Sequence, residues 1–293
     1  MKHILALLGF CLLLTSKAWA GSISITSTTE MRTTVENQMV HLQGSVTLSN
    51  GGDENAMNVF PTLRAGVWAW SGDPHSVAKG AKESWKIDAS IPLTELMCEV
   101  GSSCSKEDSG MAPRGVIPLL VRSHYSDLNG YKFTGPHVAP LYIGALTPAD
   151  TVALQEPEVS ATLSLSGNGQ SFTGALRLFN NSNQDLQVLV SSFSSVELQT
   201  LDKPREVTVR SKTPEVVKLH IQNGTGTLGS AYPVFAIVQW KQDGLWHLST
   251  PSDYLTIARK SYTMTILLGT AFFAVLVASV AASRRRRRKA RSS

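Results

Sequence analysis

Short runs of alternating apolar and polar residues fill the chain between residues 21 and 260, and most of them end at Asn, Gly, Ser or Pro. The run at 46–48 ends at Asn50, and the run at 176–178 ends at Asn180. Alternation with a period of two places side chains on opposite faces of an extended strand, and these four residue types favour turns. A helical period is visible only in two apolar segments at the chain ends. The pattern therefore predicts an all-β body of antiparallel sandwiches.

The same pattern occurs twice. GVIPLLVRSHYSDLNGYKFTGPHVAPLYIG, from residue 115, resembles GSAYPVFAIVQWKQDGLWHLSTPSDYLTIA, from residue 229: Pro118 and Pro233 each begin an apolar strand, and hairpin turns are expected at 127–130 and 243–244. Upstream, VTLSNGGDENAMNVFPTL from residue 46 parallels LRLFNNSNQDLQVLVSSF from residue 176. The recurrence of order and chemistry predicts an internal duplication.

The duplication divides the body into two β-sandwich domains, at 21–145 and 161–260. Residues 146–160, LTPADTVALQEPEVS, contain two prolines and several acidic residues without a strand period, which is typical of a linker. Each half is long enough to enclose a core of its own.

FNNSNQDLQVLVSS, followed by REVTVRSKTPEVVKLHIQ, resembles the Ig-like modules found in tandem on exported bacterial proteins, of the adhesion-related and NEW3-type groups. The resemblance implies an all-β fold of two tandem Ig-like antiparallel sandwiches exposed outside the cell membrane. It implies no activity and no functional residue. Neither half has the Cys…Trp…Cys core of antibody domains.

The chain ends indicate export and anchoring. Residues 1–20 have a basic start, an apolar run at 4–14 and small residues before a cleavage site after Ala20, which together predict a secretory signal peptide. Between Lys260 and Arg284 lie 23 uncharged residues. About 20 apolar residues cross a bilayer as a helix, so a transmembrane helix is expected at 262–282. Small residues within it permit close helix contact, and the oligomeric state stays open.

A basic tail, 283–293, follows this span. Basic residues next to a span are retained in the cytoplasm, which predicts a type I topology in a bacterial cell membrane, with the body in the periplasm or outside the cell and the tail contacting anionic lipid. Of the 27 Lys and Arg residues, 7 lie in the tail and 2 in the signal peptide, so 18 face 22 Asp and Glu in the exported part. This acidic balance argues against nucleic acid as a partner. The tail residues are Arg284, Arg285, Arg286, Arg287, Arg288, Lys289 and Arg291.

Cysteine use agrees with export. Cys11 leaves with the signal peptide, and Cys98 and Cys104 remain, separated by five residues that include Gly101. In an oxidising compartment this pair is expected to close a small disulfide loop. The spacing is unlike that of zinc sites, and no histidine is near.

Three tryptophans form the most unusual patch. Trp68 and Trp70 share one face of a strand, and Trp85 follows closely. On an exposed face the indoles would stack on a sugar or grip a partner; on an inward face they would fill the core. The pattern leaves both alternatives open.

The motifs of hydrolases, phosphate-binding loops and EF-hands are absent from the sequence, and the histidines are scattered. We therefore expect no enzyme activity, cofactor or metal. The leading hypothesis is a membrane-anchored exported protein whose modules bind or scaffold other envelope proteins. The alternative is a glycan-binding or adhesive module that uses Trp68 and Trp70.

Overall fold

The structure of the protein, a computed structural model, describes residues 22–97, 114–155, 157–168 and 170–257. The predicted signal peptide, the disulfide between Cys98 and Cys104, the span at 262–282 and the basic tail lie outside these residues. Within the described ranges, no helix is both long and apolar enough to cross a membrane. The all-β sandwich architecture expected from the alternation is confirmed.

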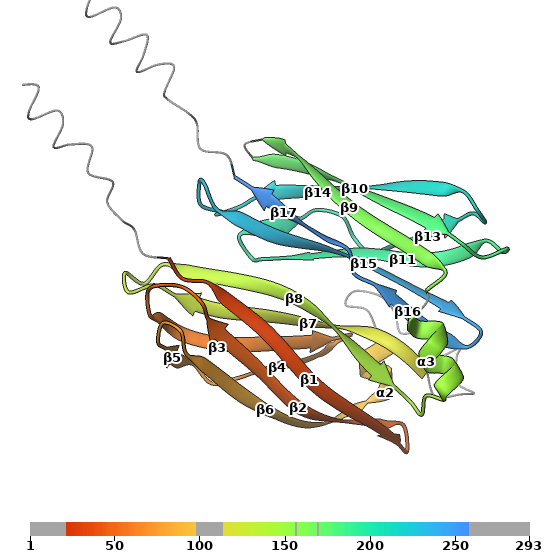
Figure 1. Cartoon of the computed structure of the whole chain (residues 1–293), viewed down its shortest axis with the longest axis horizontal. Helices are drawn as coiled ribbons and strands as arrows, with labels where there is room; N and C mark the ends of the chain where they lie inside the picture. Colours follow the sequence, from red (N-terminus) through yellow and green to blue (C-terminus); the bar gives the residue numbers. More distant parts are fainter. Residues whose placement is uncertain (1–21, 98–113, 156, 169, 258–293) are drawn as a thin grey trace, which may run out of the picture.

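The first module contains two facing sheets (Figure 1). Its elements are β1 (Ile25–Glu36), β2 (Met39–Asn50), β3 (Ala56–Ala65), β4 (Trp68–Ser71), β5 (His75–Val77), β6 (Lys82–Pro92), α2 (Leu93–Met97), β7 (Arg114–Ser126) and β8 (Lys132–Ile143). One sheet has the order β1-β2-β6. In the other, β3 pairs with β4 and β5 along one edge and with β7 along the other, and β8 pairs with β7.

The second module repeats this plan. Its elements are β9 (Val159–Asn168), β10 (Ser171–Asn180), β11 (Leu186–Ser194), β12 (Leu198–Thr200), β13 (Arg205–Val209), β14 (Pro214–Asn223), β15 (Ala231–Gln242), β16 (Leu245–Ser249) and β17 (Ser252–Thr256). One sheet has the order β12-β14-β10-β9, and β13, β11, β15, β16 and β17 belong to the other. The predicted hairpin turns lie between β7 and β8 and between β15 and β16.

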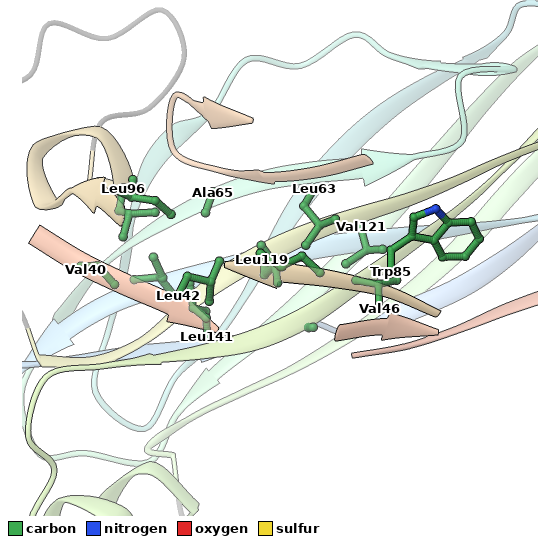
Figure 2. Packing of buried hydrophobic residues seen from close by; sticks show 14 of the residues in the cluster. Val40, Leu42, Val46, Leu63, Ala65, Trp85, Leu96, Leu119, Val121 and Leu141 are labelled. Carbon is green, nitrogen blue, oxygen red and sulfur yellow. The ribbon is translucent and has the colours of Figure 1, made fainter. Parts of the chain in front are cut away.

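Each module encloses its own core, because alternate strand residues point inward. In the first, Val46 of β2 and Leu63 of β3 meet between the sheets, with Trp85 of β6 at one end and Leu96 of α2 at the other (Figure 2). In the second, Trp240 is among the largest fully buried side chains.

A short helix, α3 (Pro148–Gln155), occupies the predicted linker. Thr147 and Asp150 form a capping box, in which the Thr147 hydroxyl accepts from the Asp150 amide at 3.1 Å and the Asp150 carboxylate accepts from the Thr147 amide at 2.8 Å. The chain then folds back, so the first and last described residues lie at the same end of the molecule (Figure 1).

The two modules hold one asparagine in the same way. Asn50 is 1% exposed and Asn180 is 0% exposed. The side-chain Nδ2 of Asn50 donates to the backbone carbonyls of Glu54 and Val77, at 2.8 and 3.2 Å, and its Oδ1 accepts from the backbone amide of Gly52.

Asn180 repeats this set of bonds. Its amide donates to the carbonyls of Gln184 and Val209, at 2.7 and 3.0 Å, and its oxygen accepts from the Ser182 amide. Asn50 therefore joins the β2–β3 connection to the end of β5, and Asn180 joins the β10–β11 connection to the end of β13.

Candidate binding groove between the modules

The modules are joined through their backbones. β16 pairs in parallel with the start of β7, Leu245 with Arg114 and Trp246 with Gly115. This makes one sheet of ten strands: seven follow the order β13-β11-β15-β16-β7-β3-β4, and β17, β5 and β8 pair with β15, β3 and β7 beside that path. Gly115 has a φ of 123°, and a Cβ there would lie 2.2 Å from the Trp246 carbonyl oxygen. Only glycine accepts both this backbone conformation and this close approach.

Apolar side chains that point away from the module cores fill the junction. Val138 of β8 and Ile237 of β15 are buried, although their strand neighbours Ala139 and Val238 are the residues that enter the cores. The outer faces of the two modules therefore cover one another, and the modules form one body.

A buried carboxylate crosses the junction. Glu197 is 5% exposed, and it accepts hydrogen bonds from the Thr134 amide at 2.9 Å and the Thr134 hydroxyl at 2.7 Å. The same hydroxyl accepts from the Val196 amide at 2.9 Å. Hydrogen bonds to a charged acceptor contribute more than neutral ones, so this small network fixes β8 of the first module to the β11–β12 connection of the second.

Arg122 crosses the junction in the same direction. Its Nη2 donates to the Ser194 carbonyl oxygen at 3.0 Å, and its guanidinium lies 4.8 Å from the centre of the Phe193 ring. Its Nε is buried and has no hydrogen-bond partner among the described residues. Burial lowers the pKa of Arg122, opposed by nearby Glu197.

Two neighbours of Arg122 on β7 also have shifted pKa values. Burial raises the pKa of the Tyr125 hydroxyl to about 12, with further contributions from Glu197 and Tyr232. Burial, and then the positive charge of Arg122, lowers the pKa of His124. The His124 ring stacks on Phe60 with centroids 4.7 Å apart.

A groove of about 700 Å³ lies between the modules beside this network. Its lining includes Arg64, Trp70, Arg122, Phe193, Pro204 and Trp246. Aromatic rings and guanidinium groups are the side chains that most often dominate protein–protein affinity. The groove thus combines a large apolar contact area with cationic donors suited to carboxylates and carbonyls.

The three predicted tryptophans lie in two settings. Trp68 and Trp70 share one face of β4, as the period of two predicted, and both are half-buried against the first core. Trp70 also lines the groove. Trp85 is buried, and its Nε1 donates to the Asp73 carbonyl oxygen at 2.8 Å.

Sequence reasoning missed the residues that build the junction. Arg122 and Glu197 resemble ordinary surface charges in the sequence, and Thr134 is one of many strand threonines. Gly115, which begins the first of the two repeated stretches, is the one signal that could have pointed to a close backbone approach.

The described residues contain no group of three or more His, Cys, Asp or Glu side chains that could hold a metal ion. The hairpin Asp127 uses its carboxylate for turn geometry: it accepts from the Asn129 and Tyr131 amides at 2.9 and 2.8 Å.

No protein-family model matches this sequence, and no curated protein matches it. Among solved structures, the chain is similar to Escherichia coli alpha-2-macroglobulin activated by porcine elastase (10% identity, TM-score 0.29, 82% of this chain and 22% of that chain). It is also similar to red sea bream transglutaminase (9%, 0.24, 82% and 31%) and to the Amycolatopsis orientalis exo-chitosanase CsxA (15%, 0.21, 77% and 26%).

The chain spans less than a third of each of these proteins. TM-scores this low indicate neither a family nor an activity for this chain. The groove and the surface of the chain are therefore the basis for its function.

Proposed function

We propose that this protein is a single-pass, membrane-anchored exported protein whose two Ig-like modules bind or scaffold another protein of a bacterial envelope. The proposal combines the signal peptide and span expected from the sequence with the inter-module groove as the contact surface. The groove is the observation that carries it. Trp70 and Trp246 supply apolar area, and Arg64 and Arg122 supply directional donors.

The junction supports this role because it removes a cost of binding. Two modules on a flexible linker would lose freedom when a ligand bridges them, whereas modules already fixed by the Gly115–Trp246 strand pair and the Thr134–Glu197 bonds lose little. The groove is therefore preorganised.

The fold-back also orients the groove. The described chain begins and ends at the same end of the molecule (Figure 1). An anchor that begins at 262 would place that end at the membrane, with both modules beside the bilayer and the groove running between them.

Photo-crosslinking of the full chain tests the proposal. A photoreactive residue at Ala69, which is exposed on the groove lining, should capture a defined envelope protein, whereas one at exposed Thr162 of β9 should not. Arg64→Glu should weaken capture about tenfold by reversing a charge at the rim, and the matched variant Arg177→Glu, exposed on β10, should leave it unchanged. Equal capture at both positions, or none at Ala69, would refute the proposal.

A glycan ligand is the second candidate, because one tryptophan of the predicted pair does line the groove. If it is correct, the detergent-solubilised protein should bind immobilised envelope glycans, and Trp70→Ala should abolish that retention while Arg177→Glu does not. Retention that survives Trp70→Ala would exclude this role for the tryptophan.

A further inference from the structure

The two modules treat the same sheet edge differently. After β11, the short strand β12 crosses to the other sheet and pairs antiparallel with β14, Leu198 with Asn223 and Thr200 with Ile221. After β3, the corresponding short strand β4 turns back and pairs with β3. The first module therefore has a three-stranded sheet, β1-β2-β6, where the second has four strands.

This leaves β6 at the edge of its sheet, at the margin of the molecule away from the second module (Figure 1). β6 pairs with β2 along Lys82–Pro92, and the described residues contain no strand on its other side. An edge of eleven residues is long enough to accept a further strand.

The direction of the β6 backbone groups follows from the two ends of the ladder. The backbone amide of Asn50 donates to the Ala81 carbonyl, and the backbone amide of Leu93 donates to the Gln38 carbonyl. Odd-numbered residues of β6 thus bond to β2, because paired residues alternate in an antiparallel ladder. The amides of Lys86 and Asp88, like those of the other even-numbered residues, point away from the sheet.

The side chains of the facing sheet that lie opposite this edge are apolar. In a sandwich, a fourth strand next to β6 would lie opposite β4, the edge of the facing sheet. Trp68 and Trp70 of β4 point into the space between the sheets and remain half-buried. In the second module, Leu198 of β12 fills the corresponding position and is 3% exposed.

We infer that β6 is an acceptor for an extended strand of a partner polypeptide, which binds antiparallel to β6 and places apolar side chains at alternate positions against Trp68 and Trp70. The second module supplies the template, since its own β12 occupies the same edge in that direction. Main-chain hydrogen bonds would hold the strand, and the indoles would select its inward side chains.

Trp70 lines both this site and the groove, but no residue of β6 lines the groove. A change to the β6 backbone therefore tests this inference separately from the proposed function. A strand bound at β6 would also cover the exposed parts of Trp68 and Trp70, which are only half-buried on the edge strand β4.

A proline at an outward-pointing amide tests the inference without breaking the β2 ladder. Lys86→Pro removes one outward N–H, and Lys86→Ala removes the same side chain but keeps the amide. The probe is a synthetic peptide with the sequence of residues 196–203, VELQTLDK, which contains β12. Binding to the full chain in detergent is followed by tryptophan emission, and circular dichroism confirms that each variant is folded.

The peptide should shift the tryptophan emission to shorter wavelength, and Lys86→Pro should weaken binding about tenfold relative to Lys86→Ala. Arg177→Glu, an exposed change on β10 of the second module, should leave this binding unchanged. The inference is overturned if no peptide binds, if Lys86→Pro binds as tightly as Lys86→Ala, or if light scattering shows that β6 is covered by a second copy of the chain and Lys86→Pro dissociates that dimer.

Discussion

The first and second modules use the same asparagine-centred connection but direct the next short strand to different sheets. Asn50 and Asn180 make matching sets of hydrogen bonds, whereas β4 stays with β3 and β12 crosses to β14. The shared part stabilises each sandwich. The part that differs decides whether a sheet edge is covered by the chain itself or left for another strand.

The two modules also differ in what lies beside their equivalent edge strands, β14 and β6. In the second module the edge of β14 is occupied by β12, and Asp202 beyond β12 accepts from the His220 amide. In the first, no strand among the described residues pairs with the outer side of the equivalent strand β6. The two edges differ because β12 joins the sheet of β14, whereas β4 stays in the sheet of β3.

The largest expected loss of stability comes from removing either of the two equivalent asparagines, Asn50 and Asn180. Asn50→Ala and Asn180→Ala should each lower the free energy of unfolding by about 3 kcal/mol, because each leaves buried backbone groups without their partner. Urea unfolding of the full chain measures both. Asn183→Ala, an exposed change in the same loop as Asn180, is the control. A large loss for one buried asparagine and none for the other would break the equivalence of the modules.

The junction between the modules is the next test. Gly115→Val should cost about 2–3 kcal/mol, since it adds a clash with Trp246 to a strained backbone. Gly130→Val is the matched control: it has a φ of 82° but nothing within 4 Å of its Cβ position, so it adds strain alone. Thermal unfolding should show a larger loss for the Gly115 variant, and equal losses would contradict the close approach.

A smaller effect is expected from the buried network. Thr134→Val removes one donor to the Glu197 carboxylate and should cost about 1–2 kcal/mol. Hydrogen exchange should locate the loosening at β8 and the β11–β12 connection and leave the far sheet of each module unchanged. Loosening confined to the first module would show that Glu197 does not couple the two.

The pH dependence should be the mildest effect. Burial lowers the pKa of His137 and His247. Below its unfolded pKa, each histidine is protonated more readily in the unfolded chain, so its contribution is present above about pH 6.5 and is lost as pH falls.

His247→Phe keeps a ring stacked on Trp240 and removes the titration. Its loss of stability between about pH 7 and pH 5 should be smaller than that of the unmodified chain. The free energy of unfolding measured across that range checks the sign, and an unchanged slope would rule out His247 as a contributor.

The period of two predicted much of the fold, because it depends only on local geometry. It placed strands at 46–48 and 176–178 and put Trp68 and Trp70 on one face. Whether that face is covered depends on which sheet the next strand joins, and the sequence of β4 does not determine this.

Other features depend on distant partners. The sequence predicts Asn50 and Asn180 as turn residues, but their roles require the carbonyls of Val77 and Val209 far along the chain. The α3 helix is different, because its capping box, Thr147 and Asp150, is a local signal that the sequence of the predicted linker already contains.

Hydrogen–deuterium exchange of the full chain at single-residue resolution tests the open edge most directly, through the Asp88 amide and its counterpart on β14, His220. The Asp88 amide should exchange rapidly, because it points away from β2, whereas its neighbour Ile87 should be protected. The His220 amide should be protected by its bond to Asp202. Protection of the Asp88 amide equal to that of Ile87 and His220 would contradict an open edge on the first module.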